Sequence, residues 1–280
     1  MRVSVVLLAV GLVPVAVSAG ELELTGHLGS VFPFYEQSFE FDPGNLPGLP
    51  PGVTVEQQDI LHLDGKGGLA LGAGVSWQFT PWLGVEGRVD TADVSVEITG
   101  ARYLIGVDLP SPLPDLSNEL VLGGGDADLH RLYPLSLNLR ARTSGRTRVG
   151  VSAGLSYLPS FSFVIVQRAT FRPLEPLPLP AAEATVTLAA EALPEDEGEG
   201  RLGANAGLFV QVGLSERLAL VAEGRYFHFR RQTLTWGLPE IDPSLPALGE
   251  ALVEEIAGQL EPVDFNPTFF QVTAGLSVRF

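Results

Sequence analysis

The last eleven residues of the chain alternate between apolar and polar side chains. The apolar positions are Phe270, Val272, Ala274, Leu276, Val278 and Phe280, and between them lie Gln271, Thr273, Gly275, Ser277 and Arg279. Successive side chains of a β-strand point to opposite faces, so this segment predicts a strand with one apolar face and one polar face. Such a strand is half-buried in a soluble sheet, or it turns its apolar face to lipid in a membrane barrel.

Seven earlier segments show the same alternation, and six of them form pairs joined by very short turns. The pairs are 67–79 with 83–90, 133–142 with 148–157, and 204–214 with 218–226, and the remaining segment is 21–31. A tilted membrane-spanning strand needs about nine to eleven residues. Eight strands would place both ends of the barrel on the side of the short turns and four long connections on the other side, which is the layout of outer-membrane barrels.

The polar and apolar faces also differ in the residues that they carry. A soluble eight-stranded barrel, such as a lipocalin-like carrier, would turn apolar residues inward and charges outward. Here the polar face mixes ionisable residues with small ones, as a narrow lumen requires, at Gly72, Gly74, Gly150, Gly154, Gly207, Gly213 and Gly275. Aromatic residues near the segment ends are typical of membrane interfaces, and these are Trp77, Phe79, Trp82, Tyr133, Tyr157 and Tyr226. The pattern favours the membrane barrel.

With its eight segments and its terminal Phe280, the chain resembles bacterial outer-membrane β-barrels of eight strands, a class that includes OmpA-like, OmpX-like and OmpW-like proteins. The resemblance selects no subfamily. It implies an all-β, antiparallel, up-and-down transmembrane barrel with short periplasmic turns and long, partly β-extended extracellular loops. It also implies a location in the outer membrane, contact with lipid and lipopolysaccharide, and recognition of Phe280 by the barrel-assembly machinery.

Residues 1–19 match a cleavable signal peptide, because Arg2 precedes a nearly continuous apolar run and Val17-Ser18-Ala19 offers small residues for cleavage. A retained signal anchor is the alternative. Residues 20–280 would then form a single barrel domain. No later stretch reaches the roughly 18 apolar residues that a spanning helix needs.

The charge and the composition of the chain exclude several kinds of partner and site. The net charge of −16 lies mainly in the long connections, which leaves a slightly basic body, and acidic loops argue against nucleic acid as a partner. The absence of cysteine excludes disulfides, thiolate metal sites and cysteine catalysis. Nothing in the sequence implies a cofactor.

Ten charged residues fall on the polar face and are predicted to meet inside the barrel. They are Glu23, Glu86, Arg88, Asp90, Arg140, Arg142, Arg148, Glu223, Arg225 and Arg279. Opposite charges in a confined lumen should pair, because an unpaired buried charge is costly. The first interpretation is a packed network that plugs the barrel, and the alternative is a network that rearranges to admit water and small ions.

The long connections contain further strand-like segments, at 94–107, 119–131, 161–171 and 183–193, so the hairpins should project beyond the bilayer. After Thr91 the apolar positions change parity, which indicates either a β-bulge near Ala92–Asp93 or a strand that has left the membrane. The second explanation is preferred. Residues 244–260 carry leucine and isoleucine at four-residue steps, which predicts a short amphipathic helix.

Catalytic and metal-binding chemistry find little support. The four histidines are His27, His62, His130 and His228, and none forms a recognisable arrangement with serine and a carboxylate. The sequence therefore predicts a protein without enzymatic activity, with a lipid-modifying enzyme as a remote alternative. Asp126 and Asp128 follow three glycines and could hold calcium, although two carboxylates are a weak signal.

The sequence thus favours a structural or surface-interaction protein of the outer membrane, whose acidic loops could bind an extracellular ligand. The alternative is a passive small channel, or a lateral-diffusion transporter that passes hydrophobic molecules sideways into the membrane, as OmpW-like proteins imply by resemblance. A continuous apolar cavity ending at a gap between strands would distinguish the transporter.

Overall fold

The structure is a computed structural model of the 280-residue chain. It describes residues 20–39, 52–108, 116–122, 125–129, 132–159, 163–174, 182–192, 200–236, 240–241 and 263–280. The proposed signal peptide, the predicted helix at 244–260 and His130 lie outside these residues. Within them, no helix is long and apolar enough to cross a membrane.

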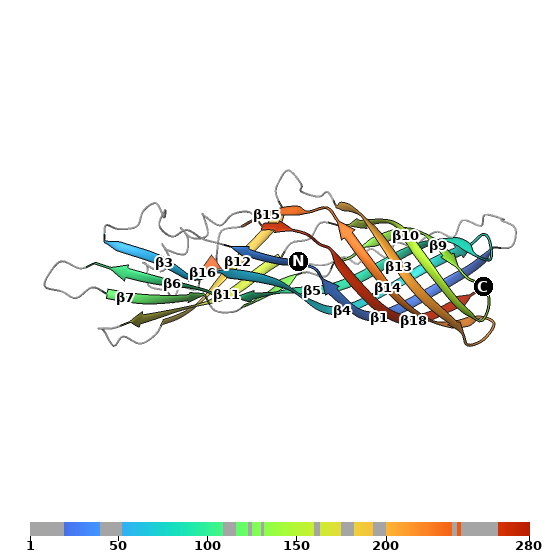
Figure 1. The fold of residues 1–280 in the computed structure, drawn as a ribbon, viewed down its shortest axis with the longest axis horizontal. Helices are drawn as coiled ribbons and strands as arrows, with labels where there is room; N and C mark the ends of the chain where they lie inside the picture. Colours follow the sequence, from blue (N-terminus) through green and yellow to red (C-terminus); the bar gives the residue numbers. More distant parts are fainter. Residues whose placement is uncertain are drawn as a thin grey trace.

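Eight strands form a closed antiparallel barrel (Figure 1). In order around the ring they are β1 (Glu21–Pro33), β4 (Leu61–Gln78), β5 (Leu83–Thr99), β9 (Leu135–Arg142), β10 (Thr147–Leu158), β13 (Arg201–Gly213), β14 (Leu218–Phe229) and β18 (Phe269–Arg279). Each strand pairs with the next along the ring. The ring closes where β18 pairs with β1, from Glu23 opposite Arg279 to Pro33 opposite Phe269. The predicted eight-stranded barrel is confirmed.

Three tight turns join the hairpins at one end of the barrel, as predicted. In the first turn the amide of Leu83 donates to the hydroxyl of Thr80 at 2.9 Å. In the second, Gly145 adopts a φ of 119°, a conformation that favours glycine because it has no Cβ. In the third, the amide of Leu214 donates to the carbonyl of Leu218 at 2.8 Å. The C-terminus lies at this same end (Figure 1), where the amide of Phe280 donates to the carbonyl of Leu22 at 2.9 Å.

At the opposite end, shorter strands build an extension on the barrel, which makes the molecule long (Figure 1). They are β2 (Glu36–Phe39), β3 (Val53–Asp59), β6 (Ala101–Val107), β7 (Leu116–Leu122), β8 (Gly125–Leu129), β11 (Phe163–Leu174), β12 (Ala182–Ala192), β15 (Gln232–Trp236), β16 (Glu240–Ile241) and β17 (Val263–Phe265). Strands β3, β6, β7, β11 and β12 pair in that order. The prediction that the long hairpins contain β-structure is confirmed, and this β-structure extends beyond the barrel.

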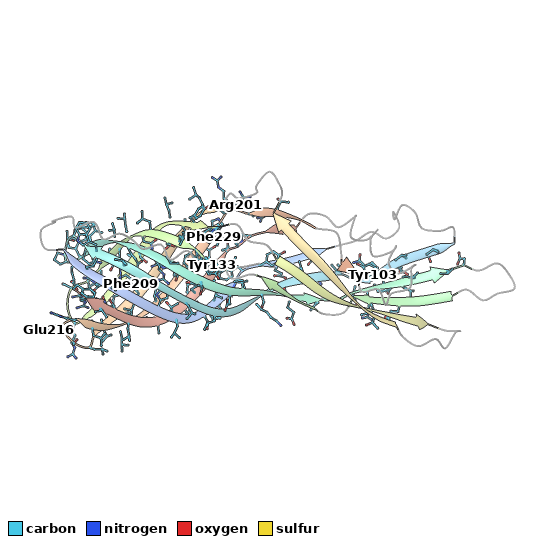
Figure 2. All side chains as sticks on the ribbon, turned by 180° about the vertical axis from the view of Figure 1, so that it is seen from behind. Tyr103, Tyr133, Arg201, Phe209, Glu216 and Phe229 are labelled. Atoms are coloured by element: carbon cyan, nitrogen blue, oxygen red, sulfur yellow. The ribbon has the colours of Figure 1, made fainter. Side chains whose placement is uncertain are left out.

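The extension has a small apolar centre of its own. Tyr103 and Ile105 on β6 are both buried, and Tyr103 lies far along the extension from the barrel (Figure 2). Burial raises the pKa of the Tyr103 phenol to about 12, because the ionised form loses hydration. The phenol is therefore neutral at physiological pH.

The change of parity after Thr91 has a cause in the barrel interior. Asp90, Ala92 and Val94 are all buried and lie on the same face of β5, so alternation continues through the segment without a bulge in β5. The register shift belongs to β4, between Gly67 and Ala70. The apolar positions change parity because the inward face changes from charged to apolar at this height.

An apolar layer therefore follows the charged part of the lumen toward the extension. Its members are buried and come from six of the eight barrel strands and from the segment before β9: Val31, Leu63, Ala70, Ala92, Val94, Leu132, Leu158, Phe227, Phe229 and Phe269. The rings of Phe227 and Phe269 stack at 4.8 Å between centroids, and those of Phe227 and Phe229 lie 6.3 Å apart. Aromatic side chains dominate the packing of this layer because they bury the largest areas.

Candidate functional site

The ten charged residues predicted for the lumen all lie on inward faces of the barrel strands. They divide along the axis into two groups. The turn-end group contains Glu23, Arg140, Arg142, Arg148 and Arg279, joined by Glu21, and the central group contains Glu86, Arg88, Asp90, Glu223 and Arg225. Arg140 links them, because its Nη1 lies 3.7 Å from an oxygen of Glu23 and 3.7 Å from one of Glu86.

Glu23 is the hub of the turn-end group and has no exposed surface (0%). Its Oε1 accepts hydrogen bonds from Arg142 Nη1 at 2.8 Å, Arg279 Nε at 2.9 Å and Gln211 Nε2 at 3.3 Å. Arg148 Nη1 lies 3.5 Å from the same oxygen. A carboxylate buried this deeply is tolerated because several guanidinium groups replace its hydration shell.

Arg225 is the hub of the central group. Its guanidinium donates to Glu86 Oε2 at 2.8 Å, Glu223 Oε1 at 2.6 Å, Asn205 Oδ1 at 2.6 Å and Ser152 Oγ at 2.9 Å. The donors of an arginine side chain lie in one plane and point in several directions. The Arg225 guanidinium can therefore bond to acceptors on several strands at once. The Arg225 side chain thus links the inner faces of β5, β10, β13 and β14.

Arg88 and Asp90 on β5 form the other half of the central group. Arg88 donates to Asp90 Oδ2 at 2.6 Å and also to Glu223 Oε2. His27 Nε2 lies 2.7 Å from Asp90 Oδ1 and 2.8 Å from Arg88 Nη2. The described residues thus place a carboxylate between an arginine and a histidine near the apolar layer.

Small residues on the polar face provide the space for these side chains. A Cβ at Gly72 would lie 2.3 Å from His27 Nε2 and 2.4 Å from Asp90 Oδ1. A Cβ at Gly150 would lie 2.3 Å from the ring of Phe209, which in turn sits 3.9 Å below the guanidinium of Arg140 in a cation–π contact. Figure 2 shows Phe209 inside the barrel toward the turn end. Large side chains thus occupy the space that these glycines leave on the inner face.

The other candidate residues that the structure describes, His62, His228, Asp126 and Asp128, lie on three different strands. His62 bonds to Ser38 on an exposed hairpin, with 2.9 Å between Nδ1 and Oγ, and His228 lies 3.1 Å from the hydroxyl of Thr268. Asp126 and Asp128 are part of strand β8. In the part of the chain that the structure describes, no group of three or more metal-ligating side chains occurs.

Several residues of the interior were missed by sequence reasoning. Glu21 shares the face of Glu23 and binds Arg142 Nη2 at 3.0 Å, so the alternation of segment 21–31 could have included it. The apolar layer was missed because Phe227, Phe229 and Phe269 continue the inward face, where only polar residues were expected. The change of apolar parity after Thr91 is the one feature of the sequence that indicates this inward apolar layer.

The outer wall of the barrel decides between a soluble and a membrane barrel. Leu137 and Leu208 are each 67% exposed, and Leu28 is 61% exposed, whereas the charged residues face inward. All six predicted interface aromatics lie at the ends of this apolar wall: Trp77, Phe79 and Trp82 near the turns, and Tyr133, Tyr157 and Tyr226 near the extension. A wall of exposed leucine and valine around a charged interior is stable only in lipid.

The fold is that of an eight-stranded outer-membrane β-barrel. Comparison by sequence matches no protein-family model and no curated protein. Among solved structures, the chain is similar to the outer membrane protein OprG from Pseudomonas aeruginosa, with 16% identity over 94% of this chain and 96% of that chain, and a TM-score of 0.40. OmpT, an outer membrane protein of Vibrio cholerae, matches with 9% identity over 96% and 100% of the two chains and a TM-score of 0.15. These likenesses are weak, and the assignment of the fold rests on the strand pairing and on the exposed apolar wall.

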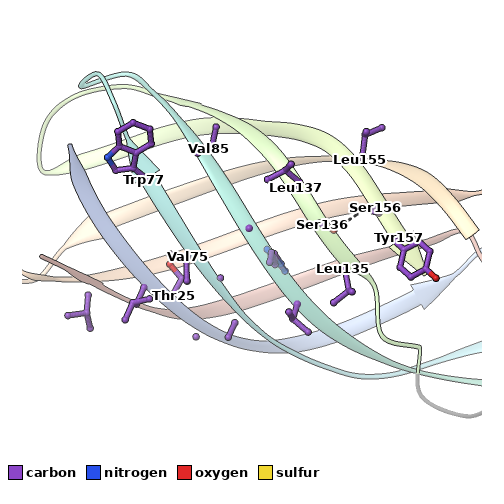
Figure 3. Close-up of a pocket in the computed structure, with 18 of the residues that line it drawn as sticks. Thr25, Val75, Trp77, Val85, Leu135, Ser136, Leu137, Leu155, Ser156 and Tyr157 are labelled. Atoms are coloured by element: carbon purple, nitrogen blue, oxygen red, sulfur yellow. Dashed lines mark hydrogen bonds between the residues drawn. The ribbon is translucent and has the colours of Figure 1, made fainter. Parts of the chain in front are cut away.

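A shallow groove of about 1080 Å³ crosses this outer wall between Leu24, Val75, Trp77, Leu137 and Tyr157 (Figure 3). The groove deepens at Gly26 and Gly87, which face outward and have no side chain to fill it. A Cβ at either position would meet no atom within 4 Å. Behind it, on the inner side, the hydroxyls of Ser136 and Ser156 bond at 2.8 Å. Its lining also includes Arg88, Ser136 and Ser156, whose side chains lie on the inner face of the strands.

Proposed function

We propose that this protein is a non-conducting outer-membrane barrel that anchors an extended β-structure outside the cell for a structural or surface-interaction role. The observation that supports the proposal is the burial of two successive sets of inward side chains, the charged network and the apolar layer next to it. A barrel of eight strands leaves room for little more than its own side chains. Both layers would have to open for water or ions to pass.

The two layers resist opening for different physical reasons. Separating Glu23 or Arg225 from its partners would leave a charge unpaired in a poorly hydrated interior, which is costly. Separating Phe227, Phe229 and Phe269 would expose large apolar rings to water. A permeant ion that entered at the turn end would first have to break the buried ion pairs. Near the extension it would then have to separate the apolar rings.

The proposal includes the following location and partners. The barrel lies in the outer membrane, in contact with lipid and lipopolysaccharide, after export directed by residues 1–19 and insertion by the barrel-assembly machinery. The acidic loops and the extension present a surface for an extracellular ligand. The role that we propose involves no cofactor, no enzymatic step and no nucleic acid.

The conductance of the protein in planar lipid bilayers tests the plugged lumen. We expect the wild-type protein to give no resolvable steady current, because both layers remain packed. The fourfold variant Glu86→Ala, Arg225→Ala, Phe227→Ala and Phe269→Ala should give current steps or a noisy leak, since it removes an ion pair from the network and two stacked rings from the apolar layer. A regular, ohmic current through the wild-type barrel would contradict the proposal.

A second prediction concerns Phe280, whose side chain is 71% exposed and fills no core. Replacing it with alanine should lower the amount of heat-modifiable, membrane-inserted protein in cells several-fold, because the assembly machinery loses its signal. Refolding of the purified variant into detergent should remain unchanged, since only the backbone amide of Phe280 bonds to Leu22. Normal insertion in cells would remove the assembly role.

The alternative of a lateral-diffusion transporter needs an apolar cavity that opens sideways above the charged network. The described side chains at that height, such as Leu132, Leu158 and Phe229, are almost fully buried. This observation favours the plugged barrel, and we do not extend the proposal to transport.

A further inference from the structure

The turn-end group carries more positive than negative charge. Four arginines, at 140, 142, 148 and 279, surround two glutamates, at 21 and 23, so the group has two positive charges in excess. The central group compensates one of these charges, because its three carboxylates face only two arginines and Glu86 lies 3.7 Å from Arg140 Nη1. One positive charge then remains in excess in a narrow, partly buried space, which is unfavourable unless an anion compensates it.

The same place contains polar atoms that have no hydrogen-bond partner within the described structure. Both amide atoms of Gln78 are buried and unbonded, and so are Arg140 Nε, Arg142 Nε and Arg148 Nη1. Gln78 is only 3% exposed and lies opposite Glu21 in the β1–β4 pair. Buried donors without partners are rare in folded proteins, so their presence beside an excess of cations indicates a ligand that accepts hydrogen bonds.

Access to the group is from the periplasmic end. The side chains of Arg148 and Arg279 are 16% and 13% exposed, whereas those of Arg142 and Glu23 lie deeper, at 1% and 0%. Arg148 is repelled by Arg142 and Arg279 and attracted by Glu21 and Glu23. Two further arginines, Arg146 and Arg217, are exposed on the adjacent turns. The periplasmic end is therefore strongly basic in a chain with a net charge of −16.

We propose that the turn-end group binds a phosphate group that enters from the periplasm, with Arg148 and Arg279 as its outer contacts and Arg142 behind them. Guanidinium groups bind phosphate oxygens with paired, charge-assisted hydrogen bonds. The phosphate belongs either to free inorganic phosphate or to the headgroup of a phospholipid in the inner leaflet. This inference goes beyond the plugged lumen, because it concerns binding and not conductance.

The test is isothermal titration of the refolded barrel in zwitterionic micelles, at constant ionic strength set by sodium chloride. One titrant is inorganic phosphate, and the other is a water-soluble, short-chain phosphatidylglycerol. We expect saturable binding of at least one of them to the wild-type protein. Saturation by both or by inorganic phosphate alone would assign the site to the free ion, and saturation by the phospholipid alone would assign it to the headgroup.

Three variants distinguish a built site from general attraction to a basic surface. Arg148→Gln should weaken binding about tenfold or more, because it removes a charged donor, whereas Arg148→Lys should retain most of the affinity because it keeps the charge. Arg217→Gln makes the same charge change on a neighbouring exposed turn and should bind like the wild type. Each variant is first checked for the heat-modifiable, folded state. No saturable binding, or an equal loss in Arg148→Gln and Arg217→Gln, would overturn the proposal.

Discussion

Replacing Glu23 with glutamine is expected to lower the free energy of unfolding of the barrel by about 3 kcal/mol, the usual effect of removing one partner from a buried ion pair. Glutamine has nearly the same shape, so the loss is mainly that of the negative charge among the arginines at 140, 142, 148 and 279. Unfolding by urea in lipid vesicles, followed by tryptophan fluorescence, measures the change.

Glu216→Gln is the matched control, because Glu216 lies on an exposed periplasmic turn at the same end of the barrel (Figure 2). Its free energy of unfolding should stay within about 0.5 kcal/mol of the wild type, as for most surface substitutions. If Glu23→Gln and Glu216→Gln have equal stability, the turn-end group does not hold the barrel together, and the physical basis of the plugged lumen is lost.

The second large effect is expected on the outer wall. Leu137→Arg should lower the free energy of unfolding in lipid vesicles by about 2–4 kcal/mol, because it places a guanidinium near the middle of the bilayer. Leu137 is 67% exposed and lies in the chain between Tyr133 toward the extension and Arg142 at the turn end. In a soluble barrel the same substitution at an exposed leucine would change stability little or increase it.

Leu214→Arg controls for the loss of a leucine and the gain of a charge. Leu214 is also exposed, at 49%, but it lies on a periplasmic turn, where a charge meets water and lipid headgroups. Its expected cost is at most about 1 kcal/mol. Equal losses in both variants would mean that lipid does not surround the wall, and the membrane-spanning assignment would fail.

The barrel could be predicted from the sequence because its strands obey one simple rule. A strand between lipid and a polar lumen must alternate apolar and polar side chains. The sequence therefore predicts hairpins such as 204–214 with 218–226, together with the short turn between them. The same rule assigned each charged residue to the inner face, and the structure places Glu23, Arg225 and the others there. Alternation does not say which partner each charge selects, since residues such as Glu23 and Arg142 are far apart in the chain.

The rule failed where its physical basis no longer applies. Beyond the bilayer the inner face need not be polar, so Phe227, Phe229 and Phe269 form a buried layer that a polar-inside pattern does not predict. The pairing of the extension was equally inaccessible, because β3 pairs with β6 and β7 with β11 across long connections. Nothing in the local sequence of these strands encodes such distant partners.

The seam between β1 and β18 has a consequence for biogenesis. The first strand after the proposed leader bonds to the last strand of the chain, and Arg279 donates to Glu23 across 256 positions of sequence. Until β18 has been synthesised, β1 and β14 each lack the neighbour that completes them, and such open edges cannot persist in hydrocarbon. The strands made earlier therefore cannot span a bilayer as an open sheet, and the ring can close only once β18 is available.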